Sequence, residues 1–182
     1  MNPAVAYGLL AHGLIFGAIV SLLPLGLLRQ RAALAATALA LLAGIAPVMH
    51  GIVGTPSVTL LFLAIWQLAG KTPSPLSYRP ALGLVIFASL FYPAALGVGG
   101  FDPYAPGYQP WALLAGLVPV AAALWWRKQN LWLIILSLDL AAYASGIFAN
   151  LWDVLIDPLL VLLALIIVCR KGIIHLIAAR NR

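Results

Sequence analysis

The chain has 182 residues, of which 64% are hydrophobic and 8% are charged, and its formal net charge is +6. Soluble domains are about 45–50% apolar and about 25% charged, so this composition argues against a soluble globular protein and indicates a protein whose solvent is the bilayer. Because Lys and Arg collect on the cytoplasmic side of membrane proteins, the positive charge does not indicate a nucleic-acid partner. We therefore expect an all-α, polytopic integral membrane protein, a bundle of about seven transmembrane helices of roughly 20 residues each.

The first half of the chain contains four predicted spans. We place them at Ala4–Leu28, Ala32–Val53, Ser57–Ala69 and Pro80–Leu96. The third is only about 13–15 residues long, which is short of the roughly 20 residues that cross a bilayer. Its preceding turn, Gly54–Ser57, is too short to reach anywhere except back into the membrane.

The second half contains three predicted spans, which begin after a long connection rich in Gly, Pro and aromatic residues. We place them at Trp111–Trp126, Leu131–Phe148 and Leu151–Val168. An aromatic pair followed by two cations, Arg127 and Lys128, is typical of the point where a helix leaves the membrane. The spans make residues 1–171 a single transmembrane domain, and 172–182 a short basic cytoplasmic tail.

The distribution of charge predicts an orientation. Threading the chain through seven spans places no Lys or Arg on the side that holds Asp102, Asp153 and Asp157. Since Lys and Arg in short loops favour the cytoplasm, we expect a bacterial-type inner membrane with the N-terminus outside and the C-terminus inside. The predicted cytoplasmic side receives Arg29, Arg31, Lys71, Arg79, Arg127, Lys128, Arg170, Lys171, Arg180 and Arg182.

The two halves show a local similarity that suggests a 3+1+3 parallel repeat, with the fourth span as a linker. The tetrapeptide His50–Val53 precedes a short Leu-rich span, and Ser145–Phe148 precedes Asp157, Pro158 and another Leu-rich run. This arrangement, with the N-terminus outside, resembles in topology the SWEET-type and related PQ-loop transporters, although neither half carries a Pro-Gln pair at the expected position.

Asp139 is the most informative single residue, because it falls near the centre of a predicted span. An ionised carboxylate at mid-bilayer costs about 2.5–3.5 kcal/mol on insertion scales. Such a residue forms a proton, cation or substrate site, or it holds helices together through a hydrogen bond to a neighbour. Both interpretations remain open.

Four further residues are candidates for a binding site. Asp153 and Asp157 are four positions apart, so they could share a proton or a cation, or they could cap helix N-termini, with Pro158 as a first helical residue. His12 and His50 belong to the predicted outer half of the membrane. Their depths differ by roughly 7–8 Å on a 1.5 Å rise, so we expect no metal or haem and no other cofactor.

Three classes of function remain open. The first is a small transporter or binding protein for a small solute or lipid-linked molecule, with an outward-facing pocket of Asp139, His50 and Asp153. The second is a non-catalytic accessory subunit of a larger membrane complex, whose partners are other membrane subunits as well as the bilayer. The third is an enzyme acting on a lipid-linked substrate at the outer leaflet, with Asp and His as acid and base. We favour a transport protein over an enzyme.

Overall fold

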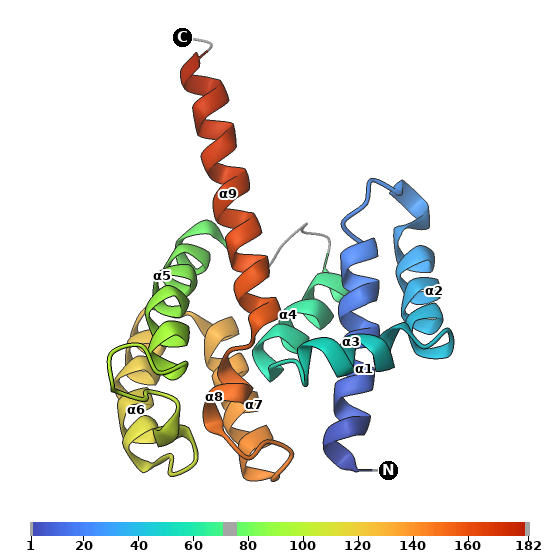
Figure 1. Ribbon diagram of the computed structural model, residues 1–182. Helices are drawn as coiled ribbons and strands as arrows, with labels where there is room; N and C mark the ends of the chain where they lie inside the picture. The colour runs from blue at the N-terminus through green and yellow to red at the C-terminus, as the bar shows by residue number, and fades with distance from the viewer. Residues whose placement is uncertain (1, 71–75, 181–182) are drawn as a thin grey trace.

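The computed structural model of the protein describes residues 2–70 and 76–180. The described residues form helices and their connections, without a β-strand (Figure 1), so the all-α fold predicted from the sequence is confirmed. Of the basic residues used to predict the orientation, Lys71 and Arg182 lie outside the described residues, as does the side chain of Arg180.

Four helices form the N-terminal part of the fold. The helix α1 packs against the other three, and α2 also packs against α3 (Figure 1). A single 3-10 turn, η1 (Gly26–Leu28), leads into the second helix. The helices are α1 (Pro3–Val20), α2 (Arg29–Leu42), α3 (Ile45–Val53) and α4 (Val58–Ala69).

The C-terminal part contains five helices. The helix α5 packs mainly against α9, whereas α6 packs against α7. A 3-10 turn, η2 (Ala105–Gly107), lies in the connection between α5 and α6. The helices are α5 (Tyr78–Ala95), α6 (Trp111–Trp126), α7 (Asn130–Ala144), α8 (Leu151–Leu155) and α9 (Pro158–Arg180).

The helix predicted at Ala32–Val53 is interrupted, because it forms two segments, α2 and α3, joined by a sharp bend. The segments Gly26–Leu42 and Ile45–Val53 are bent by 73° relative to each other. Between them Gly44 adopts φ +79°, a left-handed conformation that glycine enters without a Cβ clash. Pro47 then occupies the first turn of α3, where the missing N–H has no intrahelical partner to lose.

The helix predicted at Leu151–Val168 is also interrupted, and the alternative in which Pro158 is a first helical residue is confirmed. The first helix, α8, ends at Leu155, and Ile156 is extended, with φ −145° and ψ 139°. Pro158 then begins α9. This helix continues to Arg180, through most of the segment that was predicted to be a tail. Proline is favoured at a first helical position because its fixed φ suits the helix and no hydrogen bond is lost.

The other predicted helices agree more closely with the structure. Those at Ser57–Ala69, Pro80–Leu96 and Trp111–Trp126 correspond to α4, α5 and α6. Two others are shorter than predicted: α1 ends at Val20, ahead of Ser21, and α7 ends at Ala144.

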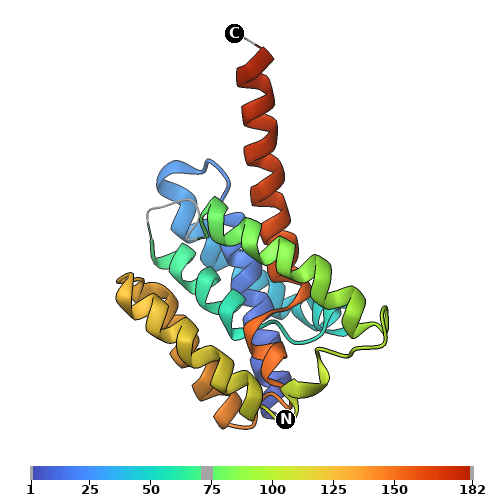
Figure 2. The same ribbon diagram turned by 90° about the vertical axis from the view of Figure 1, so that its left-hand side faces the viewer.

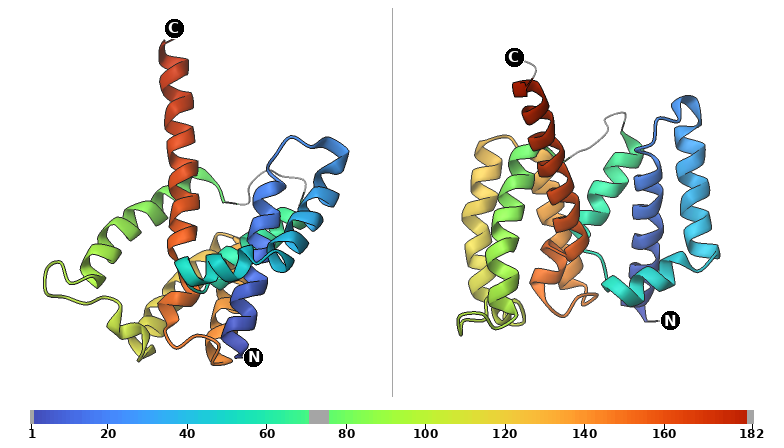
Figure 3. Two further views of the ribbon diagram at one scale, coloured as in Figure 1. Left: turned by 45° about the vertical axis from the view of Figure 1, so that its right-hand side comes forward. Right: turned by 45° about the horizontal axis from the view of Figure 1, so that its top comes forward.

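Successive long helices run in alternating directions, with the two termini at opposite ends of the bundle (Figure 3). The α1–α2 and α6–α7 connections lie at the end from which α9 emerges. We call it the basic end, because Arg29 and Arg31 lie in the first turn of α2 and Arg127 and Lys128 lie in the α6–α7 connection. The α5–α6 and α7–α8 connections lie at the other end. The C-terminal half of α9 extends beyond the other helices (Figure 2).

Helix length and composition give limited support for membrane crossing. Among the described residues, α1 alone is long and apolar enough to cross a membrane by itself. The bent pair of α2 and α3 is long and apolar enough when the two segments are taken together. The helices α4, α6 and α7 are apolar but shorter, with 12, 16 and 15 residues.

Candidate functional site

Two helices, α4 and α9, begin inside the bundle, and Asp157 joins their first turns. Its Oδ1 accepts hydrogen bonds from the backbone N–H groups of Leu159 at 2.7 Å and Leu160 at 3.0 Å, while Oδ2 accepts one from the N–H of Ser57 at 2.8 Å. The Ser57 hydroxyl in turn accepts from the N–H of Leu60 at 3.2 Å. Asp157 therefore caps its own helix and also satisfies a backbone donor at the start of α4.

Asp139 lies on α7, with its side chain 1% exposed. The hydroxyl of Thr59 donates a hydrogen bond to its Oδ2 at 2.8 Å. In the described part of the chain its other oxygen, Oδ1, has no hydrogen-bond partner, and neither has the buried hydroxyl of Tyr7. The hydrogen bond from Thr59 therefore fixes one oxygen of the carboxyl group, while the other oxygen has no donor among the described residues.

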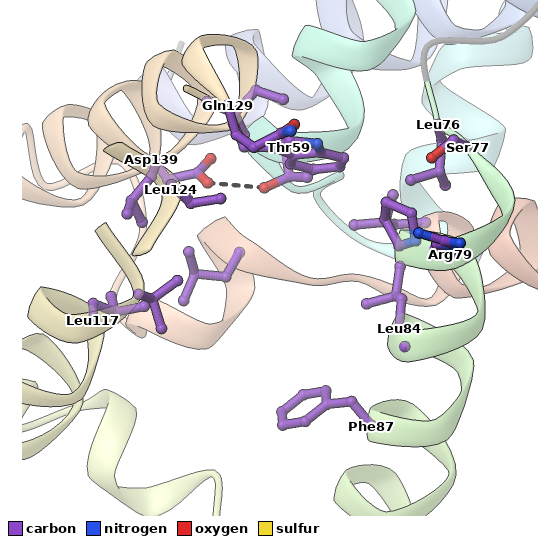
Figure 4. A pocket seen from close by; sticks show the side chains of 18 of the residues that line it. Thr59, Leu76, Ser77, Arg79, Leu84, Phe87, Leu117, Leu124, Gln129 and Asp139 are labelled. Carbon is purple, nitrogen blue, oxygen red and sulfur yellow. Dashed lines mark hydrogen bonds between the residues drawn. The ribbon is translucent and has the colours of Figure 1, made fainter. Parts of the chain in front are cut away.

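A cavity of about 680 Å³ lies against Asp139 and Thr59. It is lined by α5 on one side and by α6 and α7 on the other, and α5 packs mainly on α9. Figure 4 shows Asp139 and Thr59 on one wall and Arg79 on the opposite wall, with Phe87 between them at a lower level. At the basic end the cavity is lined by the polar residues Ser77, Arg79, Arg127 and Gln129.

Most of the remaining cavity wall is apolar. It therefore combines a long hydrocarbon surface with cations at one end and one buried carboxyl group, an arrangement common in sites for small ligands. The apolar lining consists of Leu76, Pro80, Gly83, Leu84, Phe87, Leu117, Val120, Leu124, Trp132, Ile135, Leu136, Leu155 and Leu160.

His12 and His50 are brought together at a different place. The carbonyl oxygen of Gly54 lies 2.9 Å from Nε2 of His12 and 3.2 Å from Nδ1 of His50, and the ring centroids are 6.0 Å apart. Because a carbonyl oxygen only accepts, both of these nitrogens carry hydrogen. The pair thus holds the end of α3 against α1.

Asp153 lies on the short helix α8, at the end of the bundle opposite the basic residues. Its Oδ1 accepts a hydrogen bond from the Tyr104 hydroxyl at 2.7 Å, and the Nε1–H of Trp152 donates to the Pro103 carbonyl at 2.9 Å. Burial raises the pKa of the Asp153 carboxyl, and the hydrogen bond from Tyr104 partly offsets this. Burial also raises the pKa of the Tyr104 phenol. These contacts fasten the α5–α6 connection to α8.

The five residues predicted from the sequence thus do not form one site, although His12 and His50 lie together at Gly54. Asp139 lines the cavity, whereas His12, His50, Asp153 and Asp157 are not among the described residues that line it. His50 and Asp153 form their hydrogen bonds with different connections, to Gly54 and Tyr104.

Sequence reasoning missed the contributions of Thr59, Arg79 and Arg127. The two arginines were assigned only to the charge distribution that predicts orientation. A signal was present for Thr59, since a hydroxyl three residues into a short apolar helix is a suitable partner for a buried carboxylate. No pattern in the sequence pairs it with Asp139, which is 80 positions away.

Within residues 2–70 and 76–180, no group of three or more His, Cys, Asp or Glu side chains is placed to hold a metal ion. No known protein family, characterised protein or solved structure matches the chain.

Proposed function

We propose that this chain is a multi-pass protein of a bacterial-type inner membrane. The surface of the bundle supports the proposal, because many large apolar side chains are exposed on it. Water solvates exposed side chains of this kind unfavourably, whereas lipid chains solvate them well. The most exposed of these side chains include Leu27, Leu34, Leu42, Ile52, Leu90, Leu96, Trp111 and Trp126.

The proposed orientation places the basic end in the cytoplasm and the N-terminus outside. Its support is the set of basic residues in the described part of the chain, which the alternating path of the helices assigns to one side: Arg29, Arg31, Arg79, Arg127, Lys128, Arg170 and Lys171. The order of elements is also consistent with a parallel repeat around α5. In each half a helical hairpin is followed by a short helix, a break and a further helix, as α1–α4 and α6–α9.

We propose that the protein binds an acidic amphiphile in the cavity and functions as a small transporter or binding protein for it. One observation carries this proposal: the cavity of about 680 Å³ has an apolar wall, two guanidinium groups at its basic end and a buried carboxyl group. A hydrocarbon chain fits the apolar wall, and an anionic head group fits the arginines. A free lipid-like acid and a lipid-linked phosphate share this chemistry.

The two arginines are available for such a ligand. Arg79 and Arg127 form no ion pair with an acidic residue in the described part of the chain. They flank the same cavity from α5 and from the end of α6. An anion between them would gain a charge-assisted hydrogen bond from each.

The experiment uses the full chain in nanodiscs of zwitterionic lipid and a dansyl-tagged alkyl sulfonate as the probe. A sulfonate stays anionic across the pH range of the assay. Energy transfer from tryptophan to dansyl reports binding, because Trp132 lines the cavity. We expect saturable binding, and weaker binding of the same tag with a trimethylammonium head group. Equal binding of both head groups, or binding no greater than to empty nanodiscs, would contradict the proposal.

Substitutions locate the head group. We expect Arg79→Gln and Arg127→Gln to weaken sulfonate binding by roughly tenfold each, the equivalent of about 1.4 kcal/mol for a charge-assisted contact. The matched control is Arg31→Gln, because Arg31 is an exposed cation at the same end that does not line the cavity. An equal effect of all three variants would indicate attraction to the surface charge instead.

A second candidate function is an accessory subunit of a membrane complex, and the C-terminal half of α9 favours it. This half extends beyond the bundle (Figure 1), and Ile173, Ile174 and Ile177 on it are each more than half exposed. Such a helix could dock on another membrane subunit. Purification in mild detergent with and without residues 172–182 would test this, since a docked partner is expected to depend on that segment.

A further inference from the structure

The surroundings of Asp139 fit a carboxyl group that exchanges a proton. The side chain is 1% exposed, and among the described residues the Thr59 hydroxyl alone donates a hydrogen bond to it, at Oδ2. An ionised carboxylate in an apolar interior needs several donors or a cation to replace its lost hydration. Here Oδ1 has no partner in the described part of the chain.

Among the described residues, no positively charged side chain pairs with Asp139 to offset the negative charge of an ionised carboxylate. From α4 it faces Thr59, which does not titrate, and no ion pair joins it to a cation among the described residues. Arg79 and Arg127 line the same cavity but lie at its basic end. Of the helices packed against α7, α4 carries no titratable side chain, α8 carries Asp153, and α6 is followed by Arg127 and Lys128. Tyr7 of α1 interacts electrostatically with both Asp139 and Asp157, and Arg79 of α5 lines the same cavity.

Binding of an acidic amphiphile would favour the neutral form of the Asp139 carboxyl group over the ionised form. Its anionic head would offset the positive charge of Arg79 and Arg127, which otherwise favours an ionised carboxylate in the same cavity. Its hydrocarbon chain, lying along Leu84 and Leu117, would displace water from the cavity beside Asp139. Both effects favour the neutral carboxyl group, so ligand and proton would bind with positive coupling.

We propose that Asp139 takes up one proton when the acidic amphiphile binds, so that the protein couples ligand binding to proton binding. The inference rests on the proposed function of the same cavity. The proton comes from water at the cytoplasmic end of the cavity and forms an O–H bond at Oδ1, while Oδ2 keeps its hydrogen bond from Thr59. It returns to water when the ligand leaves, and no electron is transferred.

The experiment measures binding of the dansyl-tagged alkyl sulfonate between pH 5 and pH 8, together with the number of protons taken up. Calorimetry in buffers with different ionisation enthalpies gives that number. In the wild type we expect the affinity to rise as the pH falls, by up to about tenfold per pH unit where the coupled proton is taken up. Infrared difference spectra should show a protonated carboxyl band that appears on binding.

Two variants assign the proton to this residue. Asp139→Asn resembles the protonated carboxyl, so we expect it to bind the sulfonate at all pH values as the wild type does at low pH, without proton uptake and without the infrared band. Thr59→Val removes the donor that favours the ionised form. It should move the pH dependence upward by roughly one pH unit, and it retains the carboxyl group if the asparagine variant fails to fold.

The outcomes separate this inference from the proposed function. Absence of sulfonate binding at every pH would overturn the proposed function of the cavity. Binding that is saturable but independent of pH, with no proton uptake in the wild type, would overturn the coupling alone. A pH dependence that persists unchanged in Asp139→Asn or Thr59→Val would assign the proton to another group.

Discussion

The carboxylate of Asp157 accepts a hydrogen bond from the backbone N–H of Ser57, 100 positions earlier in the chain, at 2.8 Å. This contact joins the first turns of α4 and α9, the two helices that follow a break in the chain. A helix N-terminus inside an apolar bundle leaves backbone N–H groups without partners. One buried carboxylate supplies acceptors to both helices at once, and its negative charge is favoured by both helix dipoles.

Removing this carboxylate should destabilise the whole bundle. We expect Asp157→Ala to lower the free energy of unfolding by about 2–4 kcal/mol, because three backbone donors lose a charged acceptor. Unfolding in mixed micelles with increasing dodecyl sulfate measures the change. The control is Asp102→Ala, which removes an exposed carboxylate bonded to the N–H of Tyr104 and should cost less than about 1 kcal/mol. Equal losses in the two variants would contradict the role given to Asp157.

The sequence predicted the positions of most helices, and Pro47 and Pro158 indicated where two of them are interrupted, but the geometry of the two breaks was not predicted. Hydrophobic runs identify apolar helices without showing whether a run is interrupted. The break at Gly44 depends on a left-handed conformation, and the break at Ile156 depends on an acceptor, Asp157, that also serves a helix distant in sequence. Local sequence indicates a helix start at Pro158, whereas the left-handed conformation and the contact with a distant helix are tertiary features that composition does not reveal.

The candidate site was predictable only in part. Asp139 could be identified because a carboxyl group within an apolar span requires an explanation. Its grouping with His50 and Asp153 rested on a shared side of the membrane, and the hydrogen bonds of those two residues run instead to Gly54 and Tyr104. Which helices leave a space between them is decided by packing, and packing separated α5 from α6 and α7.

The close approach of α1 and α2 gives a prediction about packing. A Cβ at Gly17 would collide with Thr37 Oγ1 and would lie 2.8 Å from the carbonyl oxygen of Ala33. We expect Gly17→Ala to destabilise the protein by about 1–3 kcal/mol, since the backbone of α2 would have to move.

A matched control is Gly116→Ala on α6, where a Cβ would meet no atom within 4 Å. That variant should be neutral or more stable by about 0.5–1 kcal/mol through helix propensity. Thermal unfolding of both variants measures the contrast. A Gly17→Ala protein as stable as Gly116→Ala would show that the helices do not approach as closely as described.

The contact between Tyr104 and Asp153 gives a prediction about pH. Because the folded protein raises the pKa of Asp153, the folded state binds more protons than the unfolded state once the pH exceeds the unfolded pKa of about 4. The contribution of this group to stability is therefore fully present below that pKa and is lost as the pH rises through the folded value.

The variant Asp153→Asn removes this titration. We expect the midpoint temperature of unfolding of the wild type, relative to Asp153→Asn, to decrease as the pH is raised from about 3 to about 7. Tyr104→Phe should keep a dependence of the same sign, because burial remains. A difference between wild type and Asp153→Asn that increases with pH would show that the hydrogen bond from Tyr104 outweighs burial.

The proposed orientation can be tested from the two ends of the bundle. Val98 lies in the α5–α6 connection and is exposed, and Arg31 lies near the start of α2 at the basic end. In a Cys169→Ser background, we expect an impermeant maleimide to label Val98→Cys in intact spheroplasts and Arg31→Cys only after permeabilisation, because Lys and Arg in short loops favour the cytoplasmic side. The cysteine-free chain controls for background labelling. The reverse pattern would invert the orientation, and labelling of both positions from outside would show that they do not lie on opposite sides of a membrane.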